Sequence, residues 1–367
     1  MEKGKISARQ FTLLVFMYSL GTSIIVHPAL TASFAGGNAW VTVITASIIG
    51  MGIIFFLNRV SSLQPEKNLF ELAEFVLGKW AGRVVSLLIL TYLLFLTSTN
   101  LRQIGDFIST QIMVATPVPF IMLIFVFTSM VAIKLGLEVI GRTCEIFFPY
   151  AVISLVLLIL LVSPEAEITN IQPILQEKPA ASFGAVIPTL GIPYLQLFVF
   201  LAIIPYVNKF KEAKKGFYIG LAAASVLLVL ITFMCLLVLG PDFTGRQVYP
   251  TYILGKKISL ANFLERVEIL VAIAWFFTIF FKISINFYVL SLGMSHFFKL
   301  KNPNSLSMPL SLIFIIMGLI LYPNIVYYQD FVSYTAVFYT FSIGTMLPLL
   351  ILVVGKIRKK GKAKKGS

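Results

Sequence analysis

Residues 13–37 read LLVFMYSLGTSIIVHPALTASFAGG and place Gly21, Thr22 and Ser23 in the middle of an apolar run, with Pro28 one to two turns later. Glycine lowers the preference for helix and proline removes a backbone hydrogen bond, so a helix breaks easily here. Unwound backbone at membrane depth is tolerated only where protein or a water-filled cavity covers it. By itself the stretch also fits a kink or a close helix contact, because small residues are common where membrane helices pack.

A second stretch, GAVIPTLGIPYLQLFVFLAIIPYV at residues 184–207, is interrupted in the same way by Pro188, Gly191, Pro193 and Pro205. The two stretches are the first and the sixth of ten apolar segments, which are corresponding positions in two halves of five helices. This arrangement is the sequence sign of an inverted-repeat transporter fold with its ligand site at the midplane. We therefore predict that the two breaks meet and form a binding site.

The composition excludes a soluble globular protein. Of the 367 residues, 58% are hydrophobic and 12% are charged, against about 25% charged in an ordinary soluble domain. At about 20 residues for each membrane-spanning helix, ten apolar segments are expected, at about residues 10–33, 38–60, 83–105, 118–136, 143–163, 184–206, 216–240, 262–290, 306–323 and 331–355. The sequence thus predicts an all-α polytopic membrane protein with about ten transmembrane helices.

The connections between these segments are short, which predicts a single transmembrane domain at residues 1–355. We expect repeat one at about 10–163, repeat two at about 184–355 and a basic cytoplasmic tail at 356–367. A cytoplasmic N-terminus would put 22 of the 29 lysine and arginine residues inside and 6 outside, so the positive-inside rule predicts both ends inside. The net charge of +14 is therefore interpreted as topology and lipid contact, not as nucleic-acid binding.

The predicted break geometry favours a small zwitterion. The N-terminus of a half-helix offers N–H groups and a positive dipole to a carboxylate, and free carbonyls accept from an ammonium group. We expect N–H groups near Ser23 and Ile24 to hold the carboxylate, and carbonyls near Leu20 and Leu190 to hold the ammonium. The candidate ligand-binding residues are Leu20, Gly21, Thr22, Ser23, Ile24, Tyr92, Thr99, Leu190, Gly191, Pro193 and Tyr194.

The third segment carries a polar patch within TYLLFLTSTNLRQIGDF, residues 91–107. Tyr92, Thr99, Gln103 and Asp106 recur at helical spacing and share one face. Arg102 lies four residues before Asp106, a spacing that allows an ion pair. The patch fits a ligand-facing role and a polar helix interface equally well.

The eighth segment, within LERVEILVAIAWFFTIFFKISINF at residues 264–287, contains a lysine at membrane depth. Lys282 shares a helical face with Trp275 and Glu268, but fourteen residues separate it from Glu268, about 21 Å along a helix, so these two charges do not pair. An ionisable group inside the membrane costs at least about 2.5 kcal/mol and marks a functional hypothesis. Trp275 and Lys282 are candidates for ion coupling or gating. The alternatives are a structural pair with a carboxylate or a helix end, or snorkelling to the interface.

Enzyme function is not expected. His27 and His296 are the two histidines, and neither has a second histidine or a carboxylate at metal-ligand spacing. The sequence has no GxSxG elbow and no phosphate-binding GxxxxGK[ST] loop. We therefore expect no metal and no cofactor.

Four stretches together resemble one family: ISARQFTLLVFMYSLGTSII at 6–25 followed by His27-Pro28, EVIGRTCEIFFP at 138–149, IIPYV at 203–207, and FLERVEILVAIAWFFTIFFK at 263–282. They resemble the B subunit of spore germinant receptors, the GerAB-like family of the amino acid-polyamine-organocation superfamily, over essentially the whole chain. In that superfamily the first-helix break usually reads GSG or GTG. Gly21, Thr22 and Ser23 match it with serine in place of the last glycine.

The resemblance implies a LeuT-type 5+5 inverted repeat with broken helices 1 and 6, in the inner membrane of a bacterial spore. It implies a nutrient sensor that acts with an A subunit and a lipoprotein C subunit to start germination. A proton- or sodium-coupled amino acid permease is the alternative, because the fold cannot separate the two functions. A scaffold with a vestigial pocket is a third possibility.

Overall fold

The computed structural model describes residues 4–172, 179–257, 266–300 and 302–363, and nearly all of them are helical. The α-helices are α1 (Ala8–Leu20), α2 (Ser23–Ala35), α3 (Ala39–Ser61), α4 (Leu69–Leu77), α5 (Lys79–Phe107), α6 (Val118–Leu135), α7 (Leu137–Val162), α8 (Pro179–Gly191), α9 (Phe210–Leu239), α10 (Pro241–Arg246), α11 (Pro250–Lys256), α12 (Glu268–Phe298), α13 (Ser307–Ile320), α14 (Ile325–Phe331), α15 (Val337–Phe341) and α16 (Leu347–Ala363). Shorter helical turns of 3₁₀ or π type are η1 (Gly36–Asn38), η2 (Ile108–Ile112), η3 (Ser163–Glu165), η4 (Ile168–Ile171), η5 (Leu195–Ala202), η6 (Ile204–Tyr206), η7 (Pro303–Leu306), η8 (Val332–Ala336) and η9 (Ser342–Met346).

The first apolar segment is broken where the glycine predicts it. Helix α1 begins at a capping box in which Ser7 and Gln10 satisfy each other's backbone N–H groups. It ends at Leu20, and the N–H of Gly21 closes the last turn on the carbonyl of Met17. Two residues later α2 begins, so the segment consists of two helices of 13 residues each. The prediction of a broken helix is confirmed.

The sixth apolar segment is broken as well. Helix α8 ends at Gly191, a turn follows through Tyr194, and the chain continues as the 3₁₀ helix Leu195–Ala202. Pro193 falls in the turn, where a residue without an N–H leaves no helical hydrogen bond unmade. Of the most apolar 18 residues of the run Gly184–Ala202, 89% are buried, so this segment lies in the interior of the bundle.

Each of the ten predicted segments coincides with helix over most of its described residues, and residues 262–265 of the eighth lie outside the described chain. The number of spans counted by helix length alone differs. Among the described residues, eight helical runs are long and apolar enough to cross a membrane. One run, Ser23–Ser61, joins α2 to the second segment, because only the short η1 separates α2 from α3. Helix α1 is too short to count, and the ninth segment appears as the shorter apolar helix Asn304–Ile320. The difference has two causes: the first break leaves α1 too short and joins α2 to the second segment, and the ninth helix is shorter than the other spans.

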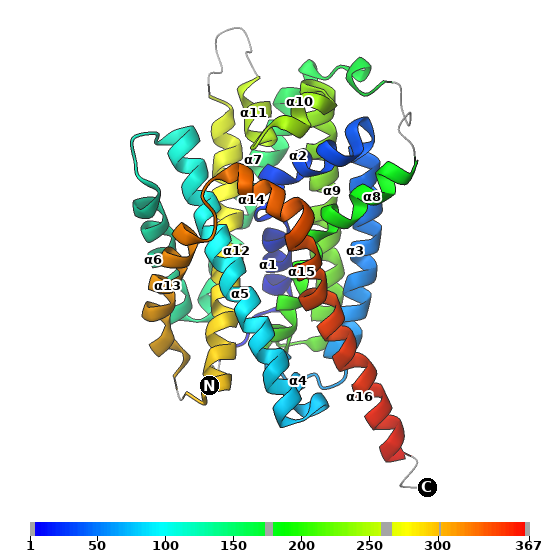
Figure 1. Ribbon diagram of the computed structural model, residues 1–367, viewed down its shortest axis with the longest axis vertical. Helices are drawn as coiled ribbons and strands as arrows, with labels where there is room; N and C mark the ends of the chain where they lie inside the picture. Colours follow the sequence, from blue (N-terminus) through cyan, green and yellow to red (C-terminus); the bar gives the residue numbers. More distant parts are fainter. Residues whose placement is uncertain (1–3, 173–178, 258–265, 301, 364–367) are drawn as a thin grey trace.

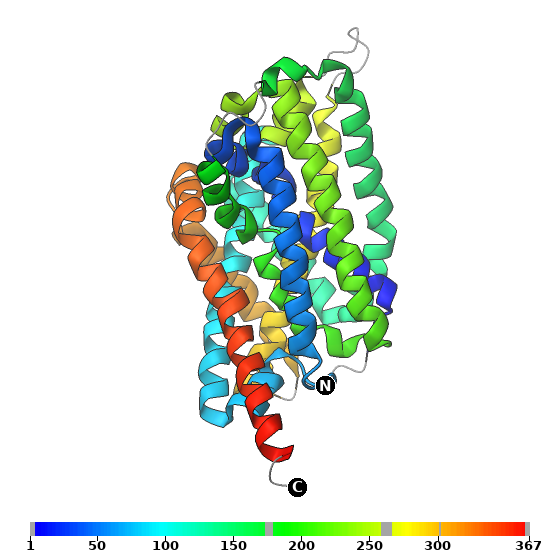
Figure 2. The ribbon, with the colours of Figure 1, turned by 90° about the vertical axis from the view of Figure 1, so that its right-hand side faces the viewer.

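Helix α1 lies inside the bundle, α8 lies at one side of it beside α3, and α6, α13 and α16 lie at its edge (Figures 1 and 2). Helix α6 is 28% buried over its most apolar window, and it exposes Phe120, Leu123, Ile124 and Phe127. Large apolar side chains on an outer helix are what lipid contact requires. The described chain begins before α1 and finishes with α16 at the same end of the molecule (Figures 1 and 2), as the even number of predicted spans requires.

Ion pairs occur near the ends of the helices. Arg102 pairs with Asp106 at 2.7 Å, as their spacing predicts, and Tyr322 donates a hydrogen bond to the same carboxylate at 3.0 Å. Arg142 pairs with Glu138 at the other end of the bundle. These ion pairs neutralise charges near the helix ends. Among the described residues, none of the candidate ligand-binding residues and neither Trp275 nor Lys282 takes part in an ion pair.

Candidate binding site at the two helix breaks

A small cavity, here called the inner cavity, lies where the two breaks approach each other. Its volume is about 30 Å³. Its lining residues are Thr22, Tyr92, Phe95, Leu96, Thr99, Asn100, Gln103, Pro188, Gly191, Ile192, Gln196, Tyr328, Val332, Ala336, Val337, Tyr339 and Thr340. Four of the eleven ligand-binding candidates therefore come together on its wall: Thr22, Tyr92, Thr99 and Gly191.

The lining of the inner cavity combines polar and apolar side chains and is uncharged, since no acidic or basic residue is part of it. The hydroxyl of Thr22 donates to Oδ1 of Asn100 at 3.2 Å, and the hydroxyls of Tyr92 and Thr340 lie 3.0 Å apart. Among the described residues, Nδ2 of Asn100 is buried and has no hydrogen-bond partner. A cavity with this lining suits a ligand with no net charge that also makes hydrogen bonds.

The other first-break candidates lie beside the inner cavity, not on its wall. Leu20 ends α1, while Ser23 and Ile24 begin α2, so their N–H groups belong to the first turn, which has no intrahelical acceptor. The carbonyl oxygen of Ile24 accepts a hydrogen bond from Thr251 at 2.7 Å. The hydroxyl of Ser23 is buried without a partner among the described residues.

The sixth-segment candidates diverge from one another. The carbonyl oxygen of Leu190 accepts from the N–H of Tyr194 at 3.3 Å, which leaves one of its two lone pairs free. The ring of Tyr194 turns away from both cavities described here, and its hydroxyl lies 2.7 Å from that of Ser47 on α3. Pro193 is buried in the turn and lines neither cavity. Tyr194 thus fixes the break against α3 and lines neither cavity.

His27 joins the two broken segments. Its Nε2 lies 3.2 Å from the carbonyl oxygen of Thr189 on α8, and its ring is fully buried. This contact links α2 to α8 immediately next to both breaks.

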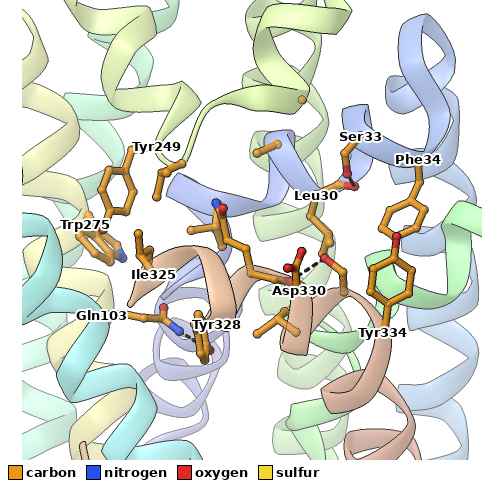
Figure 3. Close-up of a pocket in the computed structure, with 17 residues that line it drawn as sticks. Leu30, Ser33, Phe34, Gln103, Tyr249, Trp275, Ile325, Tyr328, Asp330 and Tyr334 are labelled. Atoms are coloured by element: carbon orange, nitrogen blue, oxygen red, sulfur yellow. Dashed lines mark hydrogen bonds between the residues drawn. The ribbon is translucent and has the colours of Figure 1, made fainter. Parts of the chain in front are cut away.

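A larger cavity, here called the outer cavity, lies between α2, α14 and the connection from α10 to α11 (Figure 3). Its volume is about 290 Å³. Its lining residues are Val26, Ala29, Leu30, Ser33, Phe34, Gln103, Gly245, Val248, Tyr249, Trp275, Ile325, Tyr328, Gln329, Asp330, Val332, Ser333 and Tyr334. Burial, assisted by the nearby Asp106 carboxylate, raises the pKa of the Tyr249 phenol, so this group is a neutral hydroxyl at physiological pH.

Gln103 and Tyr328 separate the two cavities, because both residues line both of them. The side-chain amide of Gln103 on α5 donates a hydrogen bond to the Tyr328 hydroxyl on α14 (Figure 3). Next to this contact the chain adopts the π-helical turn Val332–Ala336, a local widening of the helix that often occurs at functional sites. The pair, here called the partition, therefore lies between the two cavities.

The structure does not bring Trp275 and Lys282 together. Seven residues of α12 separate them, about 10.5 Å along the helix. Trp275 lies on the wall of the outer cavity and packs edge-on against Phe107, with ring centroids 4.6 Å apart. Its indole Nε1 has no partner among the described residues.

Lys282 packs against the first break instead. Its side chain is fully buried, and the nearest atom to an added β-carbon at Gly21 would be Cδ of Lys282. Its ammonium lies 5.2 Å from the ring centroid of Tyr18, and within the described part of the chain it has neither a hydrogen-bond acceptor nor a carboxylate partner. Since the lysine is fully buried, it does not snorkel. Its side chain lies beside the C-terminal end of α1, whose dipole favours a positive charge there.

Sequence reasoning missed several residues of the inner cavity. They are Asn100, Gln196, Tyr328 and Thr340. Asn100 and Gln196 are polar residues in apolar spans, a signal that was available. The contribution of the last helical run, Ile325–Arg358, here called the last helix, was not predictable in this way, because tyrosine and threonine are ordinary residues in a membrane helix.

The sequence matches the profile of the family described as spore germination protein over residues 5–325. It is 26% identical to spore germination protein KB of Bacillus subtilis (strain 168) over 99% of this chain and 98% of that protein. It is 21% identical to spore germination protein B2 of the same strain over 97% of this chain and 96% of that protein.

The fold is similar to that of two solved structures. MhsT in complex with L-phenylalanine matches with a TM-score of 0.68 at 15% identity, covering 96% of this chain and 99% of MhsT. Mhp1, a nucleobase-cation-symport-1 family transporter in a closed conformation with bromovinylhydantoin bound, matches with a TM-score of 0.69 at 12% identity, covering 97% of this chain and 90% of Mhp1. The LeuT-type fold expected from the sequence is therefore confirmed.

Proposed function

This chain belongs to the spore germination protein family, the B-subunit family of spore germinant receptors, and on that premise we propose that it binds a small neutral amino acid or a nutrient of similar size at the midplane. Binding triggers germination together with partner subunits. The family is one of permease-like membrane proteins and is not enzymatic.

One observation carries the proposal: the breaks of both interrupted helices border a single uncharged polar cavity. Thr22 comes from the first break and Gly191 from the sixth segment, and both line it. A zwitterion has no net charge and needs donors and acceptors close together, which broken helices supply from their backbone. The N–H groups of Ser23 and Ile24 at the start of α2 are the donors for its carboxylate.

The ligand needs more room than the inner cavity has, since about 30 Å³ holds roughly two water molecules. Binding therefore requires the wall to move. The last helix is the movable part, because it contributes Tyr328 and Val332 to the partition and contains the π-helical turns Val332–Ala336 and Ser342–Met346. A ligand that binds only the expanded form shifts the equilibrium toward it, and this shift is the signal.

Partner subunits are needed because the connections are too short to form a signalling domain within the described chain. We propose A and C germinant-receptor subunits as partners and the inner membrane of the spore as the location. The ammonium of Lys282 at the first break is the proposed gating charge, since a fixed positive charge in a low-dielectric interior repels mobile cations.

The test uses Gly191 and a matched glycine of the same helix. Gly191→Leu puts a side chain into the inner cavity, where the nearest atoms to an added β-carbon belong to Val337 at 3.4 Å. Spores with this variant should need about tenfold more nutrient for half-maximal germination, equivalent to about 1.4 kcal/mol. Gly184→Leu is the control, because nothing lies within 4 Å of an added β-carbon there. Equal dose-response curves for both variants, at equal protein levels in the membrane, would contradict the placement.

A proton- or sodium-coupled amino acid permease is the alternative, favoured by the buried Lys282 beside the first break. Reconstitution of the purified chain in liposomes separates the two functions. Accumulation of a labelled amino acid driven by a proton or sodium gradient would favour the permease. Ligand binding without accumulation supports the sensor.

A further inference from the structure

We propose that the outer cavity is a second binding site, separate from the midplane site, and that it takes an organic amine carrying a single positive charge and an apolar body. The proposal does not depend on the identity of the midplane ligand.

The size of the outer cavity allows such a ligand. At about 290 Å³ it is roughly at the lower limit of the volumes typical of small-molecule sites. The inner cavity, at about 30 Å³, is closed to the same molecule. In this one conformation, therefore, the outer cavity has room for a small organic molecule and the inner cavity does not.

The walls of the outer cavity are rich in aromatic rings. Tyr249 and Trp275 form one side, and Phe34 and Tyr334 form the opposite side (Figure 3). The latter two rings pack edge to face with centroids 5.7 Å apart, which holds them in place. Aromatic faces attract an ammonium group and also cover an apolar body.

The charge of the lining selects a cation. Asp330 is the one charged residue among the described lining residues, and its carboxylate makes no hydrogen bond or ion pair with any described residue. Arg246, which follows the lining residue Gly245, is exposed. A carboxylate on the ligand would therefore be repelled by Asp330, and no lysine or arginine of the lining could pair with it.

Two buried polar atoms on the same wall have no hydrogen-bond partner among the described residues. They are Oε1 of Gln103 and Nε1 of Trp275, and both side chains are at least nine-tenths buried. An unsatisfied buried acceptor costs free energy, and an ammonium that donates to Oε1 of Gln103 removes that cost. The site thus has a carboxylate, a free amide oxygen and aromatic faces, three groups that favour an amine.

A molecule bound in the outer cavity lies directly next to the inner cavity. The outer cavity shares Gln103, Tyr328 and Val332 with the inner cavity, so an amine bound here contacts the partition itself. Its expected effect is to hold the partition closed and so to slow the entry of the nutrient.

The test measures binding to the purified full-length chain with Trp275 as the reporter. The chain has three tryptophans, and replacing Trp40 and Trp80 with phenylalanine leaves the one in the cavity wall. The probes are 2-cyclohexylethylamine, β-cyclohexylalanine and 3-cyclohexylpropionate, which share an apolar body and carry a charge of plus one, zero and minus one. They do not absorb where tryptophan emits or is excited.

The amine should change the emission of Trp275 saturably and bind about fivefold or more tightly than the zwitterion, with the anion weakest. Asp330→Asn should remove most of this preference. Asp242→Asn, an exposed carboxylate on the neighbouring α10 that does not line the cavity, should keep it.

Three outcomes would overturn the proposal. The first is that the amine causes no saturable change in Trp275 emission, although the protein unfolds thermally like the parent. The second is that the zwitterion or the anion binds at least as tightly as the amine. The third is that Asp330→Asn leaves the order of the three affinities unchanged.

Discussion

The side chain of Lys282 fills the space that a β-carbon at Gly21 would need. An added β-carbon there would overlap Cδ of Lys282 and would lie 2.8 Å from the carbonyl oxygen of Tyr18. The only strongly buried lysine of the described chain is thus packed on the point where the first helix breaks. A change in either residue should be felt by the other.

We predict that Gly21→Ala destabilises the protein by about 1–3 kcal/mol, because overpacking forces neighbouring atoms to shift. Combining it with Lys282→Ala should recover part of the loss, since the shorter side chain leaves room. Thermal unfolding in detergent measures both effects. Gly52→Ala on α3 is the control, because nothing lies within 4 Å of an added β-carbon at that position. Strict additivity of the two changes would show that the residues do not interact.

Lys282→Met tests whether the buried charge has a function. Methionine keeps the unbranched shape and removes a buried amine that has no hydrogen-bond acceptor among the described residues, so the protein should become more stable, by about 1–3 kcal/mol. If Lys282 gates an ion path, the same variant should alter ion release during germination more than it alters the nutrient concentration needed. A variant with normal ion release would return Lys282 to a structural role.

The hydrogen bond between Gln103 and Tyr328 should slow the passage between the two cavities. Tyr328→Phe removes the acceptor hydroxyl and should increase the rate of nutrient binding, with about 1 kcal/mol of the barrier lost. Stopped-flow binding to the purified chain is the measurement. Tyr327→Phe is the control, because this neighbouring tyrosine is exposed and lines neither cavity. Equal rates in the two variants would mean that the partition does not limit entry.

The topology is testable by cysteine labelling in whole cells. An engineered cysteine at Glu167, which is exposed, should react with a membrane-impermeant reagent, and one at Lys209 should react only after permeabilisation. The native Cys144 and Cys235 are buried, so their background is low. Labelling in the opposite order would reverse the predicted orientation.

The repeat boundaries at about 10–163 and 184–355 also remain a prediction.

Much of the fold was predictable from local sequence. The apolar segments follow from composition, because a membrane helix must be about 20 residues of apolar side chains. The two breaks follow from Gly21 and from Pro188, Gly191 and Pro193, whose backbone chemistry disfavours continuous helix wherever they lie. The pair Arg102–Asp106 follows from a spacing of four. Each of these depends on residues near one another in the chain.

The site was predictable only in part. Thr22, Tyr92, Thr99 and Gly191 do line the inner cavity, but Tyr194 points to Ser47 and Trp275 faces a different cavity from the one at the breaks. The helical spacing that puts Trp275 and Lys282 on one face says nothing of which neighbour each side chain meets. That is set by the crossing of helices.

The sequence by itself determined the membrane class, the helical segments and the positions of the breaks, because these depend on the side chains and backbone of consecutive residues. Only the tertiary structure decided that Lys282 packs on Gly21, that Tyr328 of the last helix lies between the two cavities, and that the outer cavity has aromatic walls and one carboxylate. The physical reason is that these contacts join residues up to 261 positions apart, as Gly21 and Lys282 are. Which of the many possible partners touch is fixed by close packing of the whole bundle and leaves no local trace in the chain.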